Sequence, residues 1–170
     1  MKNLLAFFIL VSILAGFACT QKSETPEETK ARIQQESAEV GNVIEAYNAD
    51  LCRWYASGDI DSVVTVFAED ARQSPPNAPA IEGREAMREF WKQAVTWGQW
   101  NFSLKTVSVI ANGPIAVELG RYTVQFTAGP EAPPGIKAYD SGDYVCYWRF
   151  EEDGKWRIVY DIPSSDQPCE

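Results

Sequence analysis

The chain has 170 residues, and its 24 acidic residues outnumber its 15 basic ones to give a formal net charge of -9. Such a chain repels phosphate backbones and has no basic stripe, so we expect no nucleic-acid partner. It contains no histidine, which excludes Ser-His-Asp and Cys-His nucleophilic systems and histidine-based metal sites.

The first 19 residues have the pattern of an export leader. Lys2 is followed by an apolar run over residues 4–17, which is too short to span a bilayer comfortably, and then by Ala18 and Cys19. This pattern resembles a bacterial lipoprotein signal, although Gly16 stands where leucine is usual. The resemblance implies acylation of Cys19 and an exported bacterial lipoprotein, anchored to the membrane and facing the periplasm or cell exterior. The alternative is an ordinary secretory signal that contains a cysteine.

The chain beyond the leader fits one domain. Residues 1–18 are predicted as signal peptide, 19–38 as a lipid-anchored polar linker, 39–165 as the folded domain and 166–170 as a tail. Residues 20–29 are rich in Ser, Thr, Glu and Lys and lack apolar periodicity, so they are predicted as linker or as the frayed entry to a helix.

A long helix is predicted over residues 31–55. Glycine tolerates the left-handed position at a helix end and aspartate accepts amide hydrogen bonds, so Gly58 and Asp59 are predicted to end this helix and cap a second one over residues 60–67. Six apolar residues recur in the long helix at helical spacing: Ile33, Val40, Ile44, Tyr47, Leu51 and Trp54.

A short strand over residues 71–74 precedes a third helix. Two prolines end the strand, and the helix begins after Gly83. Its apolar face is predicted to consist of Met87, Phe90, Trp91 and Ala94 or Val95.

The second half of the chain is predicted to form strands. Strands over residues 102–110 and 115–127 flank the strong hairpin signal Asn112-Gly113, and strands over 139–150 and 155–162 form a last hairpin. Helices followed by antiparallel strands favour an α+β fold whose sheet curls around the long helix.

Three segments, in this order and spacing, carry a family resemblance: residues 56–59 (Ala-Ser-Gly-Asp), residues 67–71 (Phe-Ala-Glu-Asp-Ala) and residues 83–91. They resemble the SnoaL-like branch of the nuclear transport factor 2-like superfamily, and residues 143–162 resemble its domain-of-unknown-function 4440 group. The resemblance implies a cystatin-like cone in which three N-terminal helices pack on a curved antiparallel sheet around a cavity. Because the superfamily includes isomerases, cyclases, dehydratases and non-catalytic binding or dimerisation modules, the fold does not decide the function.

The resemblance also implies where ketosteroid-isomerase machinery would lie. Ungapped counting places its carboxylate base at Pro75, its tyrosine at Leu51 and its protonated aspartate at Cys146. None of these residues has the required side chain, and only Tyr47, one turn before Leu51, offers a replacement. Steroid-type isomerase chemistry is therefore not expected.

An aromatic pocket is the predicted ligand site. Such a lining suits a small apolar or planar ligand, whereas a solid aromatic core without a cavity is the alternative. The expected partners are therefore a small hydrophobic ligand and a second copy of the chain, bound through the sheet. The predicted lining consists of Trp54, Phe67, Trp91, Tyr122, Tyr144, Cys146 and Trp148.

Asp161 is the main candidate for acid–base chemistry, because it interrupts an apolar run at the end of the last strand. Burial would raise the pKa of this carboxyl group and suit it to act with Tyr47 or Tyr144. The alternative is a carboxylate paired with Arg121 or Arg157. An isomerase, cyclase or hydrolase thus remains open beside a non-catalytic binding domain, which the sequence favours.

The cysteines predict no metal or cofactor site. Cys52, Cys146 and Cys169 lack C-x-x-C spacing, and no glycine-rich loop suited to phosphate is present. A Cys52–Cys146 disulfide and two buried free thiols both remain open.

The lipid anchor is tested by Cys19→Ser. Loss of the acylated thiol should release the protein from the membrane fraction of its host, because the acyl chains hold the anchor by about 0.8 kcal/mol per buried methylene. Cys169→Ser removes a different thiol and should leave fractionation unchanged. A Cys19→Ser protein that stays membrane-bound would exclude acylation as the anchor.

Overall fold

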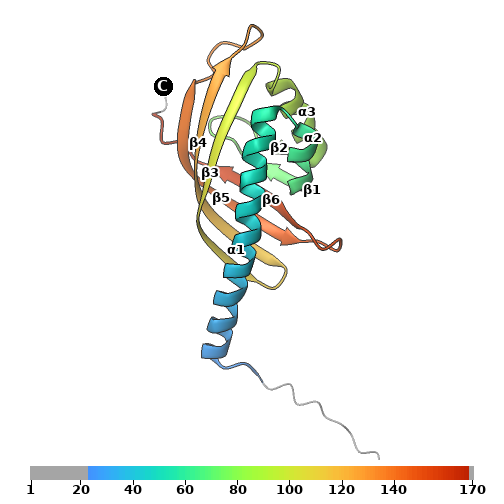
Figure 1. Ribbon diagram of the computed structural model, residues 1–170, viewed down its shortest axis with the longest axis vertical. Coiled ribbons are helices and arrows are strands. Elements are labelled where there is room, and N and C mark those ends of the chain that lie inside the picture. The colour runs from blue at the N-terminus through green and yellow to red at the C-terminus, as the bar shows by residue number, and fades with distance from the viewer. Residues whose placement is uncertain (1–22, 169–170) are drawn as a thin grey trace, which may run out of the picture.

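One six-stranded sheet wraps around a long helix in the computed structural model, which describes residues 23–168 (Figure 1). The helices are α1 (Pro26–Ser57), α2 (Ile60–Val63) and α3 (Arg84–Ala94), with a 3-10 turn at Val64–Val66. The strands are β1 (Phe67–Gln73), β2 (Ile81–Glu82), β3 (Gly98–Asn112), β4 (Ile115–Ala128), β5 (Tyr139–Phe150) and β6 (Trp156–Pro163). The predicted cystatin-like arrangement of helices on a curved sheet is confirmed.

The strand order is β2-β1-β6-β5-β4-β3. All neighbouring strands are antiparallel except β1 and β6, which run parallel. The sheet is therefore mixed rather than wholly antiparallel as expected. A parallel pair needs a long connection, and here most of the domain separates β1 from β6. This pairing brings Gln73, at the C-terminal end of β1, beside Asp161 of β6, and both residues line the cavity described below.

Helix α1 begins at Pro26, earlier than predicted, so residues 26–38 are helical rather than linker. A capping box between Thr25 and Glu28 starts the helix, and such reciprocal bonds satisfy two amides that the helix leaves open. Further along, the Arg32 guanidinium donates to Asn112 Oδ1 at 2.9 Å in the β3–β4 hairpin. The acidic first turn lacks the apolar periodicity that predicts a helix. The capping box and the Arg32–Asn112 contact stabilise it as a helix instead.

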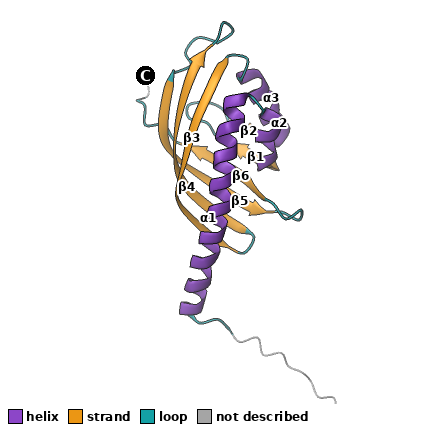
Figure 2. Cartoon of the chain, viewed as in Figure 1, coloured by secondary structure: helices purple, strands orange, loops and turns teal. Residues whose placement is uncertain are grey.

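Only the C-terminal half of α1 packs closely on the sheet (Figure 2). Its buried residues are Ile44, Asn48, Leu51 and Tyr55, which lie on one face at spacings of three and four. The predicted apolar face was rotated slightly from this one. Its members Val40, Tyr47 and Trp54 are half-buried at the border, because a polar residue, Asn48, occupies the centre.

The predicted second helix over residues 60–67 is shorter in the structure. Asp59 caps α2 by accepting from the Ser62 amide at 3.2 Å, but a 3-10 turn follows and Phe67 already belongs to β1. Phe67 is paired with Ile158 of β6, so sheet pairing overrides the helical pattern at this position. The third helix and the Asn112-Gly113 hairpin are confirmed.

Two glycines let two tyrosines lie flat against the sheet. Gly120 is opposite Tyr144 across β4 and β5, and Gly142 is opposite Tyr122. A Cβ atom on Gly120 would come within 2.1 Å of the Tyr144 ring, and one on Gly142 within 3.2 Å of the Tyr122 ring. Packing of an aromatic ring over a cross-strand glycine fixes both tyrosines on the inner face.

Some sequence predictions fall outside the described residues, namely the leader with Cys19 and the terminal Cys169. Over residues 23–168, no helix is long and apolar enough to cross a membrane. Cys52 and Cys146 are both free thiols, so the disulfide alternative is not realised.

Gly120→Ala is expected to destabilise the domain by about 2 to 4 kcal/mol, because the new methyl group would displace the Tyr144 ring and its buried hydrogen bond. Chemical denaturation followed by tryptophan fluorescence measures the free energy of unfolding. Gly41→Ala is the matched control: its methyl group would meet Val109 at an ordinary 3.8 Å, and alanine should stabilise the helix by about 0.5 to 1 kcal/mol. Equal effects of both substitutions would contradict this role of Gly120.

Candidate functional site

A cavity of about 260 Å³ lies between α1, α3 and the inner face of the sheet. It excludes the alternative of a solid aromatic core. The loop after β1 supplies Pro75 and Pro76, and α3 supplies the solvent-exposed Phe90. The lining comprises Asn48, Leu51, Tyr55, Phe67, Gln73, Pro75, Pro76, Phe90, Trp91, Trp100, Phe102, Leu104, Tyr122, Val124, Asp140, Tyr144, Cys146, Ile158, Asp161 and Pro163.

Four rings from different elements form one wall of the cavity: Tyr55 of α1, Trp91 of α3, and Trp100 and Phe102 of β3. The Tyr55 ring centroid is 4.7 Å from that of Trp91 and 4.8 Å from that of Phe102. The Trp91 and Trp100 rings meet edge to face at 5.7 Å. These are favourable aromatic geometries, so we call this group the aromatic wall.

A β-bulge in β6 turns Asp161 toward the cavity. Cys146 is paired with Asp161 and Tyr147 with Tyr160, but Trp148 is paired with Ile158, so Val159 is an extra residue. Strict alternation from Ile158 would point Asp161 outward, and the extra residue reverses this. Bulges commonly re-aim a side chain in this way.

The Asp161 carboxylate is held by a directed chain of hydrogen bonds. Trp91 Nε1 donates to Gln73 Oε1 at 3.0 Å, and Gln73 Nε2 donates to Asp161 Oδ2 at 2.8 Å. An indole N–H can only donate, so the orientation of the Gln73 amide is determined and its NH2 group must face Asp161. The Cys146 thiol makes a weaker contact with Oδ1 at 3.6 Å.

Burial dominates the titration of this cluster. It raises the pKa of Asp161 above its ordinary value of 3.8; the bonds from Gln73 and Cys146 oppose the rise, and the charge of Glu118 adds to it. The pKa values of Cys146 and Tyr55 are raised too, first by burial and then by the charge of Asp161. The thiol and the phenol are therefore neutral at physiological pH, which leaves Asp161 as the group in this cluster that ionises most readily.

A second carboxylate, Glu118 of β4, has no exposed surface. Its Oε1 accepts from Asn48 Nδ2 at 2.7 Å, from Thr106 Oγ1 at 2.8 Å and from the Tyr144 hydroxyl at 2.7 Å. Its Oε2 accepts from Trp148 Nε1 at 3.1 Å. Four donors thus satisfy the buried carboxylate, as a charge removed from water requires.

Both tyrosines that lie over glycines donate to carboxylates. Burial and the neighbouring Glu118 charge raise the pKa of Tyr144. The Tyr122 hydroxyl donates to Asp140 Oδ2 at 2.8 Å, and burial and this hydrogen bond raise its pKa. Each hydroxyl therefore keeps its proton and is committed to a protein partner.

The profile of the SnoaL-like domain family matches residues 44–159, which include the cavity-forming helices and almost the whole sheet. The chain belongs to the SnoaL-like domain family. No curated protein sequence matches it.

Solved structures of low sequence identity share the fold. A ketosteroid isomerase-like protein from Erwinia carotovora atroseptica is 17% identical with a TM-score of 0.63, over 75% of this chain and 96% of that one. An NTF2-like protein with a cystatin-like fold from Novosphingobium aromaticivorans is 16% identical with a TM-score of 0.64, over 86% and 93%. A protein from Catenulispora acidiphila, solved in complex with S-DNPA, is 13% identical with a TM-score of 0.61, over 76% and 95%.

The SnoaL-like cavity contains all three positions that counting assigned to isomerase machinery. Leu51, Pro75 and Cys146 each line it. The three positions inferred from the family resemblance therefore lie in the cavity, but none of them carries a carboxylate or hydroxyl group. Asp161, on the strand next to Cys146, brings a carboxylate into contact with one of these positions.

Five of the seven predicted pocket residues line the cavity: Phe67, Trp91, Tyr122, Tyr144 and Cys146. The other two do not. Trp148 is fully buried against Glu118, and Trp54 is half-buried at the edge of the core.

The candidate polar residues are also divided. Tyr47 does not line the cavity, and its ring stacks on Trp148 with centroids 5.9 Å apart. Tyr144 lines the cavity but has its hydroxyl bonded to Glu118. Asp161 lines the cavity and is not paired with either arginine suggested from the sequence. Arg121 instead binds Asp143 and Asp166, and Arg157 binds Glu151 and Asp153.

Several residues in or beside the site were missed from the sequence, among them Glu118, Gln73 and Tyr55. Glu118 has the same strand parity as Tyr122, so alternation alone could have placed it inside. Tyr55 follows Leu51 by four residues and could have been found by helical spacing. Gln73 had no such signal, because its position depends on the parallel pairing of β1 with β6. No cluster suited to a metal ion occurs among residues 23–168.

Asp161→Asn is expected to raise the free energy of unfolding at neutral pH. Because the folded-state pKa lies above the ordinary 3.8, the folded protein binds this proton more tightly than the unfolded chain does. The stability contributed by Asp161 is therefore complete below pH 3.8 and is lost as the pH rises through the raised pKa. Denaturation curves over a pH series should show the variant's advantage shrink as the pH falls below the raised pKa and disappear near pH 3.8.

Asp143→Asn is the matched control, since Asp143 lies on the same sheet with an exposed carboxylate paired to Arg121. It should not reproduce this pH-dependent gain. If Asp161→Asn is less stable than the unchanged protein at neutral pH, the carboxylate is better solvated than the cavity geometry implies.

Proposed function

We propose that this SnoaL-like domain binds one small, planar, largely apolar molecule in the cavity. The proposal rests on a cavity that is lined by the aromatic wall and contains one hydrogen-bonded polar pair, Gln73 and Asp161. Apolar walls with a few convergent polar groups are typical of small-molecule sites.

The volume limits the size of this molecule. A cavity of about 150 Å³ holds benzene, so about 260 Å³ accommodates roughly ten to twelve non-hydrogen atoms. One or two rings fit, and a four-ring steroid does not. The relative solved in complex with S-DNPA supports ligand binding by this fold.

Proton transfer at Asp161 is the second candidate function. The raised pKa and the position of this carboxyl group in the cavity suit it to act as a general acid or base. Tyr55, a neutral hydroxyl beside Gln73 and Asp161, is the tyrosine placed to assist it. Exchange of solvent deuterium into a bound ketone, lost in Asp161→Asn, would identify this activity.

We also propose that the domain dimerises through the outer side of its sheet. The exposed apolar residues there are contiguous: Leu119 is paired with Val145, and Val145 with Ile162. Ion pairs border them, including Arg121 with Asp143 and Asp166. An apolar centre with a charged border is typical of an interface. We call this group the outer apolar face: Ile115, Val117, Leu119, Val145, Tyr160 and Ile162.

We further propose that the chain is lipid-anchored and belongs to the domain-of-unknown-function 4440 group. Lipid anchoring at Cys19 is supported by the leader pattern, and membership of the domain-of-unknown-function 4440 group is supported by the resemblance of residues 143–162. Together with the cavity, they describe an exported domain that captures a small molecule near a membrane.

Ligand binding predicts that a neutral two-ring probe such as 2-naphthol changes the tryptophan fluorescence of the domain with saturation. Val124→Phe, which adds a larger side chain to the cavity wall, should weaken this binding at least about tenfold by occupying the space. Val117→Phe is the matched control, because it lies on the same strand with an exposed side chain. It should leave the affinity unchanged.

Native mass spectrometry of the domain purified from its host gives an independent measurement of bound ligand. Absence of both a co-purified ligand and saturable probe binding would refute the pocket proposal. Equal weakening by the two valine substitutions would place the probe elsewhere on the molecule.

Dimerisation predicts that Val145→Lys yields a monomer, because the charge would be buried without a partner at the centre of the outer apolar face. Light scattering coupled to gel filtration measures the mass. Val43→Lys, on α1, introduces the same charge at a valine of similar exposure, 42% against 41% for Val145, and should leave the mass unchanged. A monomeric unchanged protein at all concentrations would rule out the dimer.

A further inference from the structure

We propose that the cavity is selective for an organic cation, namely a protonated or quaternary amine carried on one or two rings, with its nitrogen beside Asp161 and its rings against the aromatic wall. This inference rests on the proposed ligand-binding function and adds to it the charge class of the ligand.

Most of the polar hydrogens of the cavity wall are already committed to the protein. The Tyr144 hydroxyl donates to Glu118 and the Tyr122 hydroxyl to Asp140. Trp91 Nε1 donates to Gln73, and Trp100 Nε1 donates to the Ala94 carbonyl at 2.8 Å. A ligand that needs donors, such as a carboxylate or phosphate, therefore finds few that are free.

Acceptor capacity, by contrast, remains at Asp161. A carboxylate can accept about four hydrogen bonds, and the protein supplies this one with the Gln73 amide and a weak thiol contact. Asp140, the other carboxylate in the lining, is better satisfied: it accepts from Tyr122, from Ser165 Oγ at 2.6 Å and from the Ser141 amide at 2.8 Å. Asp161 is thus the group to which a ligand donor or positive charge would bind.

The charge balance points the same way. The cavity lining contains two aspartates and no lysine or arginine, and Glu118 adds negative charge that acts on Asp161. The arginines near the rim of the sheet are engaged with exposed carboxylates, as Arg121 is with Asp143. An anion would enter this cavity unpaired, whereas a cation would neutralise Asp161 and reduce the penalty of its burial.

The aromatic wall completes the site. The faces of aromatic rings carry negative electrostatic potential and attract ammonium groups, most strongly in the case of tryptophan. Tyr55, Trp91 and Trp100 line the same cavity as Asp161, and Trp91 is joined to it through Gln73. A carboxylate and tryptophan rings that line the same cavity are a combination suited to alkylated ammonium groups.

The pH dependence is set by the groups that face Asp161. These are Gln73 on β1, Cys146 on β5, Tyr55 on α1 and, at longer range, Glu118 on β4. The thiol and phenol keep their protons, so Asp161 is the one that changes charge as the pH rises. Affinity for a quaternary amine, whose own charge is constant, should therefore increase with pH through the titration of Asp161.

The test compares three probes of similar size by calorimetric titration of the domain. Benzyltrimethylammonium is the cation, neopentylbenzene is its uncharged analogue of the same shape, and phenylacetate is an anion. At mildly alkaline pH the cation should bind at least about tenfold more tightly than the uncharged analogue, and phenylacetate more weakly than both.

Asp161→Asn should abolish the preference for the cation and its pH dependence while leaving the affinity for neopentylbenzene within about threefold, since the cavity shape is retained. Asp143→Asn removes the same charge from an exposed position and should keep the preference. Equal or tighter binding of neopentylbenzene or phenylacetate overturns the inference and leaves the ligand-binding proposal intact. Failure of all three probes and of 2-naphthol overturns both.

Discussion

The structure depends on a charge that has no contact with water. Glu118 is fully buried, and a carboxylate removed from solvent is tolerated only if it is fully hydrogen-bonded. Its four donors come from α1, β3 and β5. All four bonds can form only if α1 has a particular rotation about its axis and β3, β4 and β5 pair in a particular register. A slip of one residue in β4 would turn Glu118 outward and leave Asn48, Thr106, Tyr144 and Trp148 without an acceptor. The same bonds hold Tyr144 in the cavity wall, so the network that specifies the packing also shapes the site.

The site itself arises from an irregularity in the sheet. The extra residue Val159 in β6 turns Asp161 inward beside Cys146 and leaves Tyr160 and Ile162 on the outside. One bulge therefore places the Asp161 carboxylate in the cavity and two members of the outer apolar face on the opposite side of the sheet. Because Gln73 is brought to Asp161 by the parallel pairing of β1 with β6, this pairing and the bulge in β6 meet at the same carboxylate.

Much of the architecture could be predicted from the sequence because local signals agreed with the final packing. The bounds predicted for β5 and the Asn112-Gly113 turn match the structure, since both rest on short-range alternation and turn chemistry. Asp161 was selected because it interrupts an apolar run, but its inward orientation depends on a bulge that alternation cannot reveal. Glu118 was not singled out from the sequence, and Trp148 was assigned to the pocket lining because of its aromatic character, whereas in the structure the two bind each other. Contacts across the sheet decide such cases, and a single sequence does not record them.

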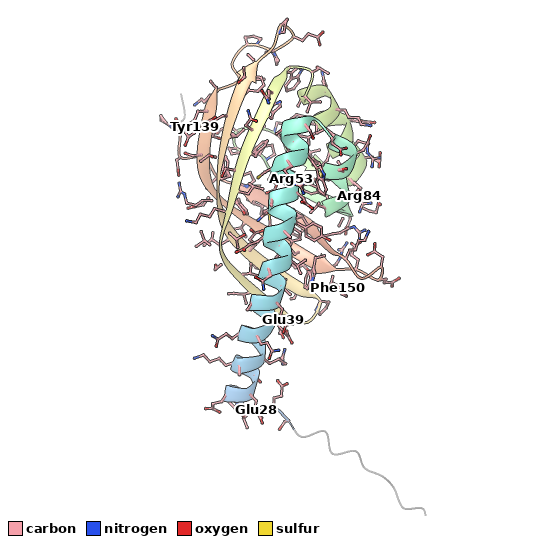
Figure 3. The ribbon with its side chains drawn as sticks, viewed as in Figure 1. Glu28, Glu39, Arg53, Arg84, Tyr139 and Phe150 are labelled. Carbon is pink, nitrogen blue, oxygen red and sulfur yellow. The ribbon has the colours of Figure 1, made fainter. Side chains whose placement is uncertain are left out.

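Helix α1 also determines how far the cavity lies from whatever is joined to its first turn. In Figure 3, Glu28 lies at the free end of the helix, well below the sheet, and Arg53 lies at the end enclosed by the domain. The helix rises about 1.5 Å per residue, so the 22 residues from Pro26 to Asn48, the first in the cavity lining, span about 33 Å. A tether at the N-terminal end would hold the cavity on a stiff spacer comparable in length to the thickness of a bilayer's hydrocarbon core. If the proposed acylation of Cys19 supplied this tether, a molecule dissolved in the bilayer would have to leave it to reach the cavity.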